Sequence, residues 1–351
     1  MLPTTLTVPL ADDFHVHLRQ GALMNAVTPL LNGSGLATAY VMPNLKPPIS
    51  STDQALAYKA ELQKLAPGIN FLMTLYLGPE LTPDEIRKAA KAGIAGVKSY
   101  PRGVTTNSDS GIESYTAYYP VFAAMEEHDM VLNLHGEIPS DPENDICVMN
   151  AEERFLTHLQ QLHTAFPKLR IVLEHATTRA AVEMVKSLGE TVGCSITVHH
   201  LALIVDDWAG CCHNFCKPVA KFPHDRAALR EVVKAAHPRF FLGTDSAPHP
   251  RHTKEAPQTV AGVFTSALVL PYLATILDGF DALDSLRAFA CENGRRFYKL
   301  APRTGAAATE AALVKEPVQV PQEYAYVDDE GNKRSIVPFM AGKTLTWSLR
   351  T

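Results

Sequence analysis

The chain has 351 residues, of which 46% are hydrophobic and 20% are charged, so it can bury a large core. This composition excludes a disordered chain, a collagen-like repeat and a small disulfide scaffold. The net charge of −5 provides no bulk positive field for nucleic acid or an anionic membrane surface.

No apolar stretch reaches the length of about 20 residues that a membrane-spanning helix needs. The longest one, residues 266–277, is interrupted by Pro271. The N-terminus lacks the basic start and apolar core of a secretory signal, and this predicts a cytoplasmic protein.

Short apolar runs alternate with helix-like segments along the chain. The runs that we expect to form strands are 14–18, 36–43, 69–78, 94–100, 130–136, 170–176, 193–201 and 239–245. Helices are predicted over 51–66, with Ser51 or Thr52 as N-cap, and over 82–93, with Thr82 as N-cap. Eight strand–helix units predict an α/β fold, a (β/α)8 barrel of the TIM type, because continuous apolar strands need cover on both faces of a parallel sheet.

The C-terminal part of the sequence changes character. Helical segments are predicted over 257–277 and near 281–290, and the chain then becomes more polar. We therefore assign residues 1–300 to the barrel and residues 301–351 to a short extension that packs on its outside.

Six cysteines show no spacing typical of a disulfide framework, so reduced thiols are expected. Three of them crowd the segment CCHNFC, as Cys211, Cys212 and Cys216. A zinc knuckle would need a second ligand pair at usable spacing, which the sequence lacks, and partly buried thiols are the simpler interpretation.

Metal-ligand residue types lie at the predicted strand ends: His15, His17, Lys98, His135, His175 and Asp245. A histidine after an apolar run is more often a hydrogen-bonded core residue, and a lone strand-end lysine usually forms an ion pair. The C-terminal ends of barrel strands, however, converge on one mouth. Residues 15 and 17 lie two apart on a strand, so both can face the barrel axis while Val16 packs outward.

Several motifs carry a family resemblance: HVHLR at 15–19, MPN at 42–44, GVKSYP at 96–101, LHGE at 134–137, LEHATT at 173–178 and GTDSAPH at 243–249. Together they resemble the amidohydrolase superfamily and, within it, the dihydroorotases of the shorter, bacterial and fungal type. The resemblance covers most of residues 8–300.

The resemblance implies two Zn²⁺ per chain, bridged by Lys98 carboxylated on its amine. It places His15, His17 and Asp245 on the more buried metal and His135 and His175 on the other. It also implies the reversible cyclisation of N-carbamoyl-L-aspartate to L-dihydroorotate in pyrimidine biosynthesis, with Asp245 transferring the proton, and a homodimer.

For the substrate, the resemblance adds Asn44 and His249 to Arg19, whose guanidinium can hold a carboxylate bidentately. It also implies backbone contacts near Lys217 and Ala261, although Lys217 departs from the leucine of bacterial members. The polar stretch 102–111, with Thr105 and Thr106, is predicted to form a lid over the mouth.

Two other functions compete with this interpretation. A hydantoinase or dihydropyrimidinase would share the metal ligands, but Arg19, Asn44 and His249 favour a substrate that bears a carboxylate. A non-catalytic barrel scaffold would be expected to have lost ligands, and all six are present.

Overall fold

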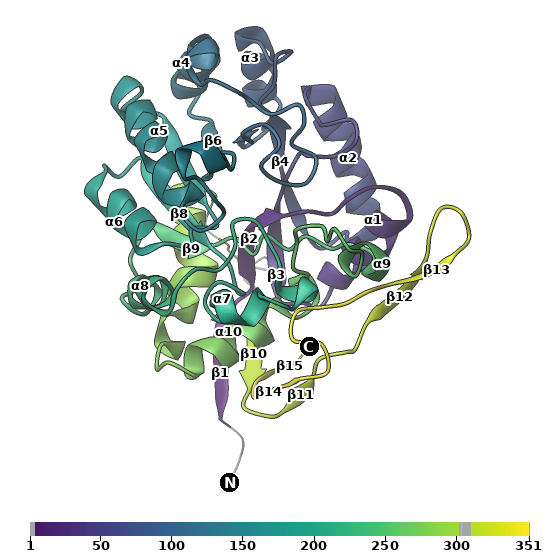
Figure 1. The fold of residues 1–351 in the computed structure, drawn as a ribbon. Helices are drawn as coiled ribbons and strands as arrows, with labels where there is room; N and C mark the ends of the chain where they lie inside the picture. Colours follow the sequence, from purple (N-terminus) through teal and green to yellow (C-terminus); the bar gives the residue numbers. More distant parts are fainter. Residues whose placement is uncertain (1–3, 302, 304–309, 351) are drawn as a thin grey trace.

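The computed structural model describes residues 4–301, 303 and 310–350. Eight parallel strands follow one another in a single sheet in chain order (Figure 1). They are β2 (Ala11–Val16), β3 (Leu36–Val41), β4 (Asn70–Tyr76), β5 (Gly96–Ser99), β6 (Val131–His135), β7 (Arg170–Glu174), β8 (Val192–Ile196) and β9 (Phe240–Leu242).

The first and last strands of this sheet meet and close the cylinder. Beyond β9, the Asp245 N–H donates to the His15 carbonyl at 2.9 Å, and the His17 N–H donates to the Ser246 carbonyl at 3.0 Å. The prediction of a (β/α)8 barrel is therefore confirmed.

Helices surround the barrel (Figure 1). The longer ones are α2 (Thr52–Leu65), α3 (Pro83–Lys91), α4 (Tyr119–Glu127), α5 (Ala151–Ala165), α6 (Arg179–Ser187), α8 (Pro223–Lys234) and α10 (Val269–Asp278). Shorter ones are α1 (Gly21–Val27), α7 (Val205–Trp208), α9 (Arg251–Lys254) and α11 (Asn293–Phe297).

Local sequence accounts for the predicted helices α2 and α3. Ser51 caps α2 in a reciprocal arrangement with Gln54, and Thr82 caps α3 by accepting from the Glu85 N–H. These caps satisfy N–H groups that have no partner inside the helix.

The structure corrects three element boundaries. The predicted helix over 257–277 is wrong in its first half, because α10 begins only at Val269 and Pro271 lies in its first turn, where no N–H is required. Residues 281–290 form a short 3-10 turn and the start of a π-helical segment at Ala288–Glu292 instead of one α-helix. Strand β2 ends at Val16, so His17 follows the strand.

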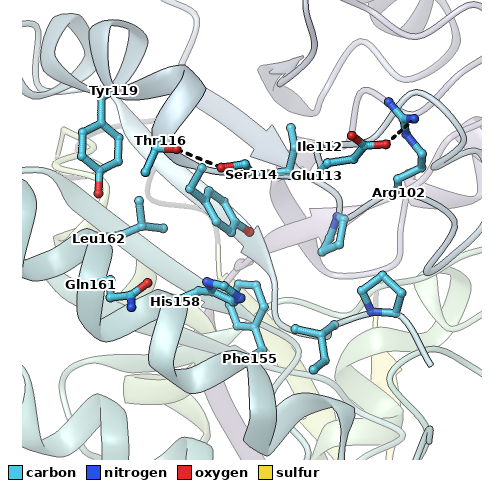
Figure 2. Close-up of a pocket in the computed structure, with 14 residues that line it drawn as sticks. Arg102, Ile112, Glu113, Ser114, Thr116, Tyr119, Phe155, His158, Gln161 and Leu162 are labelled. Carbon is cyan, nitrogen blue, oxygen red and sulfur yellow. Dashed lines mark hydrogen bonds and ion pairs between the residues drawn. The ribbon is translucent and has the colours of Figure 1, made fainter. Parts of the chain in front are cut away.

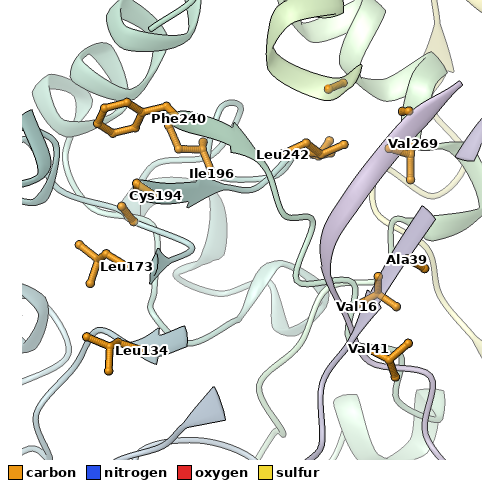
Figure 3. Packing of buried hydrophobic residues seen from close by; sticks show 14 of the residues in the cluster. Val16, Ala39, Val41, Leu134, Leu173, Cys194, Ile196, Phe240, Leu242 and Val269 are labelled. Carbon is orange, nitrogen blue, oxygen red and sulfur yellow. The ribbon is translucent and has the colours of Figure 1, made fainter. Parts of the chain in front are cut away.

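The barrel core is made by apolar side chains of the strands and of the helices that cover them. Figure 3 shows Val16, Val41, Leu134 and Leu173 among the buried residues of this cluster. Val16 packs in this core, as the alternation of the strand predicted. Among the described helices, none has the length and hydropathy needed to cross a bilayer.

The C-terminal residues form small antiparallel sheets that also include the N-terminal strand. β10 (Glu310–Val314) lies between β1 (Thr5–Pro9) and β15 (Ser348–Arg350). β11 (Val318–Gln319) pairs with β14 (Thr344–Leu345), and β12 (Tyr324–Val327) pairs with β13 (Lys333–Ile336). We retain the division at residue 300 as a proposal, with β1 joined to the C-terminal sheet.

Candidate metal centre

Five of the six predicted ligands line one cavity at the C-terminal end of the barrel: His15, His17, His135, His175 and Asp245. The sixth, Lys98, lies on β5 and is fully buried. His15 and His175 rings lie 5.0 Å apart, and His175 and His135 rings lie 4.8 Å apart, measured between centroids. The barrel thus brings together side chains that are up to 230 residues apart in sequence, since residue 245 minus residue 15 is 230.

The two nitrogens of His17 face two oxygens. Nδ1 lies 2.8 Å from Asn44 Oδ1, and Nε2 lies 3.0 Å from Asp245 Oδ1. Burial lowers the pKa of His17 to about 4, so the ring is neutral and carries one proton. With that proton on Nδ1, a lone pair on Nε2 faces a carboxylate oxygen, which is the arrangement that a cation between them would satisfy.

His15 repeats this pattern. Its Nδ1 lies 2.8 Å from Glu174 Oε2, and its Nε2 lies 3.4 Å from Asp245 Oδ1. One ligand atom from each of His15, His17 and Asp245 falls within 4.8 Å of the others. Although burial raises the pKa of Asp245, the close contact with His17 Nε2 and the neighbouring His15 hold it below its usual range. Two imidazoles and a carboxylate form a suitable cation site.

The other two histidines of the cavity, His135 and His175, are held in the neutral form that binds metals. Burial lowers the pKa of both His135 and His175. His135 Nε2 lies 2.8 Å from Glu137 Oε2, whereas His175 Nδ1 has no hydrogen-bond partner among the described residues.

The Lys98 amine is buried, lacks a hydrogen-bond partner among the described residues and has a lowered pKa, as expected of an amine that is chemically modified. Its Nζ lies 4.8 Å from the centre of the Tyr100 ring and makes no hydrogen bond within the described part of the chain. Burial lowers its pKa to about 8, so the neutral amine is accessible near neutral pH. The orphaned, fully buried nitrogen fits a modified lysine whose carbamate oxygens would be neutralised by cations.

Sequence reasoning missed the second layer of this site. Glu174 bonds to His15, and its other oxygen accepts from Asn133 Nδ2 at 2.6 Å. Ser195 Oγ also donates to Glu174. The signal available was the carboxylate beside His175 in LEHATT, since histidine ligands usually donate their second nitrogen to such a group.

The predicted substrate residues line the same cavity: Arg19, Asn44, Lys217 and Ala261. His249 is adjacent, with Nε2 3.0 Å from Arg19 Nη2 and 3.0 Å from the Ala261 carbonyl. Arg19 does not belong to the strand that carries His15, because β2 ends at Val16 and Arg19 has a left-handed backbone, φ 62°. Its guanidinium reaches the cavity from the loop instead.

The predicted lid lies across this cavity. The Thr106 carbonyl accepts from Asn44 Nδ2 at 3.0 Å, and Asn107 Nδ2 donates to the Asn44 carbonyl at 2.9 Å. Thr105 and Thr106 both line the space below. The cavity encloses about 20 Å³, which is room for about one water molecule. That this loop moves to admit a substrate stays a prediction.

A larger cavity of about 370 Å³ lies elsewhere, beside α5, and is shown in Figure 2. Tyr119, Phe155, His158 and Leu162 line it, and none of the predicted ligands does. Its volume alone does not make it the reactive site.

Comparisons with known proteins identify the family of the chain. The family described as Amidohydrolase matches residues 51–300. A dihydroorotase of Mycosarcoma maydis is 53% identical, and a probable dihydroorotase of Schizosaccharomyces pombe is 48% identical, each match covering 98% of both chains. The crystal structure of dihydroorotase in complex with 5-fluoroorotic acid from Saccharomyces cerevisiae has a TM-score of 0.92 and 43% identity, covering 99% of this chain and 98% of that one. The chain therefore belongs to the amidohydrolases and, among them, to the dihydroorotase family.

Proposed function

We propose that this chain interconverts N-carbamoyl-L-aspartate and L-dihydroorotate at a centre of two Zn²⁺. The observation that carries the proposal is one cavity lined by four imidazoles and Asp245, with the Arg19 guanidinium in the same space. Imidazoles and a carboxylate suit divalent metals, and a guanidinium suits a substrate carboxylate.

The proposed ligands divide into two sets. His15, His17 and Asp245 would hold one cation, His135 and His175 the other, and carboxylated Lys98 would bridge them. Formation of the carbamate requires the neutral amine, and the burial of Lys98 favours it. When bound, the two cations supply Lewis acidity toward the ring amide carbonyl and toward an attacking water.

Asp245 is the proposed proton carrier of the reaction. In hydrolysis it takes a proton from the attacking water and passes it to the leaving ring nitrogen. In ring closure it removes a proton from the carbamoyl nitrogen, which then attacks the side-chain carboxyl carbon of the same molecule. Asp245 gives that proton to the departing carboxyl oxygen, so the C–O bond breaks and the oxygen leaves as hydroxide, which a proton from solvent converts to water. Because both reacting groups belong to one substrate, no bimolecular entropy cost arises.

Arg19 is proposed to hold the α-carboxylate, together with Asn44 and His249. Its Nε already donates to the Pro248 carbonyl at 2.9 Å, so the guanidinium is fixed before substrate binds. The backbone near Lys217 and Ala261 would contact the ring amide, and the lid residues Thr105 and Thr106 would exclude water.

The substrate carboxylate separates this proposal from a hydantoinase or dihydropyrimidinase activity. A hydantoin ring bears no carboxylate for Arg19, so dihydroorotate should be the preferred substrate. A non-catalytic scaffold is disfavoured because four imidazoles and the Asp245 carboxylate converge on one cavity as a ligand set.

The test is an assay of both reaction directions with the zinc-loaded chain, with and without chelator. We expect turnover of both substrates, about two zinc ions per chain, and loss of activity with chelator. Absence of turnover in a zinc-loaded, folded chain would refute the proposal. The proposal includes a cytoplasmic homodimer. Sedimentation analysis of the mass in solution can check the oligomeric state, and cell fractionation can check the location.

A further inference from the structure

A second group of metal-ligand side chains lies outside the candidate metal centre. His199 and His200 follow β8, and Cys216 lies in the loop before α8. All three are buried, and one ligand atom of each falls within 4.8 Å of the other two. None of the three lines the cavity of the candidate metal centre.

The hydrogen bonds of this group are incomplete. Cys216 Sγ lies 3.4 Å from His200 Nε2, and both atoms face the Pro218 carbonyl, at 3.2 Å and 3.0 Å. Protons on the thiol and on His200 Nε2 would satisfy these two atoms, whereas His200 Nδ1 has no hydrogen-bond partner among the described residues. Within the same part of the chain, neither ring nitrogen of His199 has a hydrogen-bond partner.

A buried imidazole with neither nitrogen bonded is costly, because its desolvation is not compensated. The rings of His199 and His200 lie 4.4 Å apart between centroids. A cation that accepts a lone pair from each ring and from the sulfur would remove this cost for His199 and replace the two protons that now point at one oxygen.

We propose that His199, His200 and Cys216 form a further metal site with two nitrogen ligands and one sulfur ligand, selective for Zn²⁺. A thiolate with imidazoles favours zinc over the harder Mg²⁺ and Ca²⁺. On binding, the Cys216 thiol releases its proton to solvent and the sulfur donates an electron pair to the ion. The Pro218 carbonyl oxygen, close to both Nε2 and Sγ, is positioned to complete the coordination.

The charges around Cys216 do not oppose a cation. Asp245 and Glu137 contribute two negative charges, and Lys221 and Lys254 contribute two positive ones. The two ammonium groups already have oxygen partners, since Lys254 Nζ donates to three carbonyls and Lys221 Nζ donates to the Val219 carbonyl.

The site would join two segments that shape the substrate cavity. Cys216 precedes Lys217, which lines that cavity, while His199 and His200 extend from β8. A cation held between them would fix the loop of Lys217 relative to the barrel. The CCHNFC segment thus finds its partner ligands in space and not in sequence.

Cobalt provides a test that is independent of activity. The full chain is freed of metal and titrated with Co²⁺, and the near-ultraviolet charge-transfer band of a cobalt–thiolate bond is recorded. The ligands of the candidate metal centre contain nitrogen and oxygen only, so this band reports the new site alone. We expect the band in the unmodified chain, its loss in Cys216→Ser, and at least tenfold weaker cobalt binding in His199→Gln.

Cys291→Ser is the matched control, because Cys291 is also buried and its thiol also donates to a carbonyl, that of Pro9, at 3.1 Å. The band should persist in this variant. No cobalt–thiolate band in the folded, cobalt-loaded chain would overturn the proposal, as would an unchanged band in Cys216→Ser. If Cys216→Ser does not fold, His199→Gln decides, and unchanged cobalt affinity there overturns the proposal.

Discussion

Glu174 on β7 reaches His15 on β2, with its Oε2 2.8 Å from His15 Nδ1, although the two strands are not neighbours in the sheet. This contact holds the His15 ring with Nε2 turned toward Asp245, 3.4 Å from its Oδ1. Asn133 and Ser195 hold Glu174 in turn. The carboxylate therefore orients a proposed metal ligand, and it is not among the residues that line the cavity.

Glu174→Gln should weaken metal binding by about 10–100-fold, because it removes the charge that orients and polarises His15. Competition with a chelator measures the affinity. The exposed Glu183→Gln is the control and should bind metal normally. Unchanged affinity in Glu174→Gln would show that the contact with His15 is only structural.

Lys98→Met should abolish the bridged metal pair and the activity, yet stabilise the metal-free chain by about 1–3 kcal/mol. The reason is that the methionine side chain fills the site without burying an unpaired amine. Denaturant unfolding of both metal-free proteins measures the difference. The exposed Lys91→Met should leave stability nearly unchanged, and a destabilised Lys98→Met would contradict the argument.

Thr106→Ala should lower kcat/KM about fivefold at unchanged metal content. The hydroxyl lines the cavity and contacts the Ala261 carbonyl at 3.4 Å, and one neutral hydrogen bond contributes about 1 kcal/mol. The bond from Asn44 to the Thr106 carbonyl involves the backbone and remains. Kinetics equal to those of the unmodified chain would remove the Thr106 hydroxyl from the proposed mechanism.

Arg19→Gln should raise KM for dihydroorotate about 10–100-fold, because a charged hydrogen bond to the substrate carboxylate contributes about 1.5–3 kcal/mol. Metal content should not change, since Arg19 is not a proposed ligand. Steady-state kinetics together with metal analysis separates the two effects. If KM stays the same, the carboxylate is held by other groups.

Glu152 should make stability depend on pH. Burial raises its pKa from 4.5 to about 7, so the folded state prefers the protonated carboxyl, and stability from this group falls as pH rises from about 4.5 to about 7. The loss is at most about 3 kcal/mol. Glu152→Gln should reduce the fall, which unfolding measurements across this range can detect. Parallel pH profiles for both proteins would refute the assignment.

The sequence alone determined the barrel and its ligand residue types. Apolar runs such as 170–176 alternate with capped helices such as α2, and both signals are local, because burial of a strand and capping of a helix depend on neighbouring residues. The family motifs added the expected roles of Lys98 and Asp245.

Only the tertiary structure decided which atoms meet. The contact of Glu174 with His15 and the approach of His199 to Cys216 each join segments whose spacing carries no signal. The sequence also did not determine the backbone conformation of Arg19. Its left-handed conformation after β2 depends on how the barrel closes. Strand periodicity specifies which face a side chain takes, whereas closure of the cylinder sets the distances between strand ends.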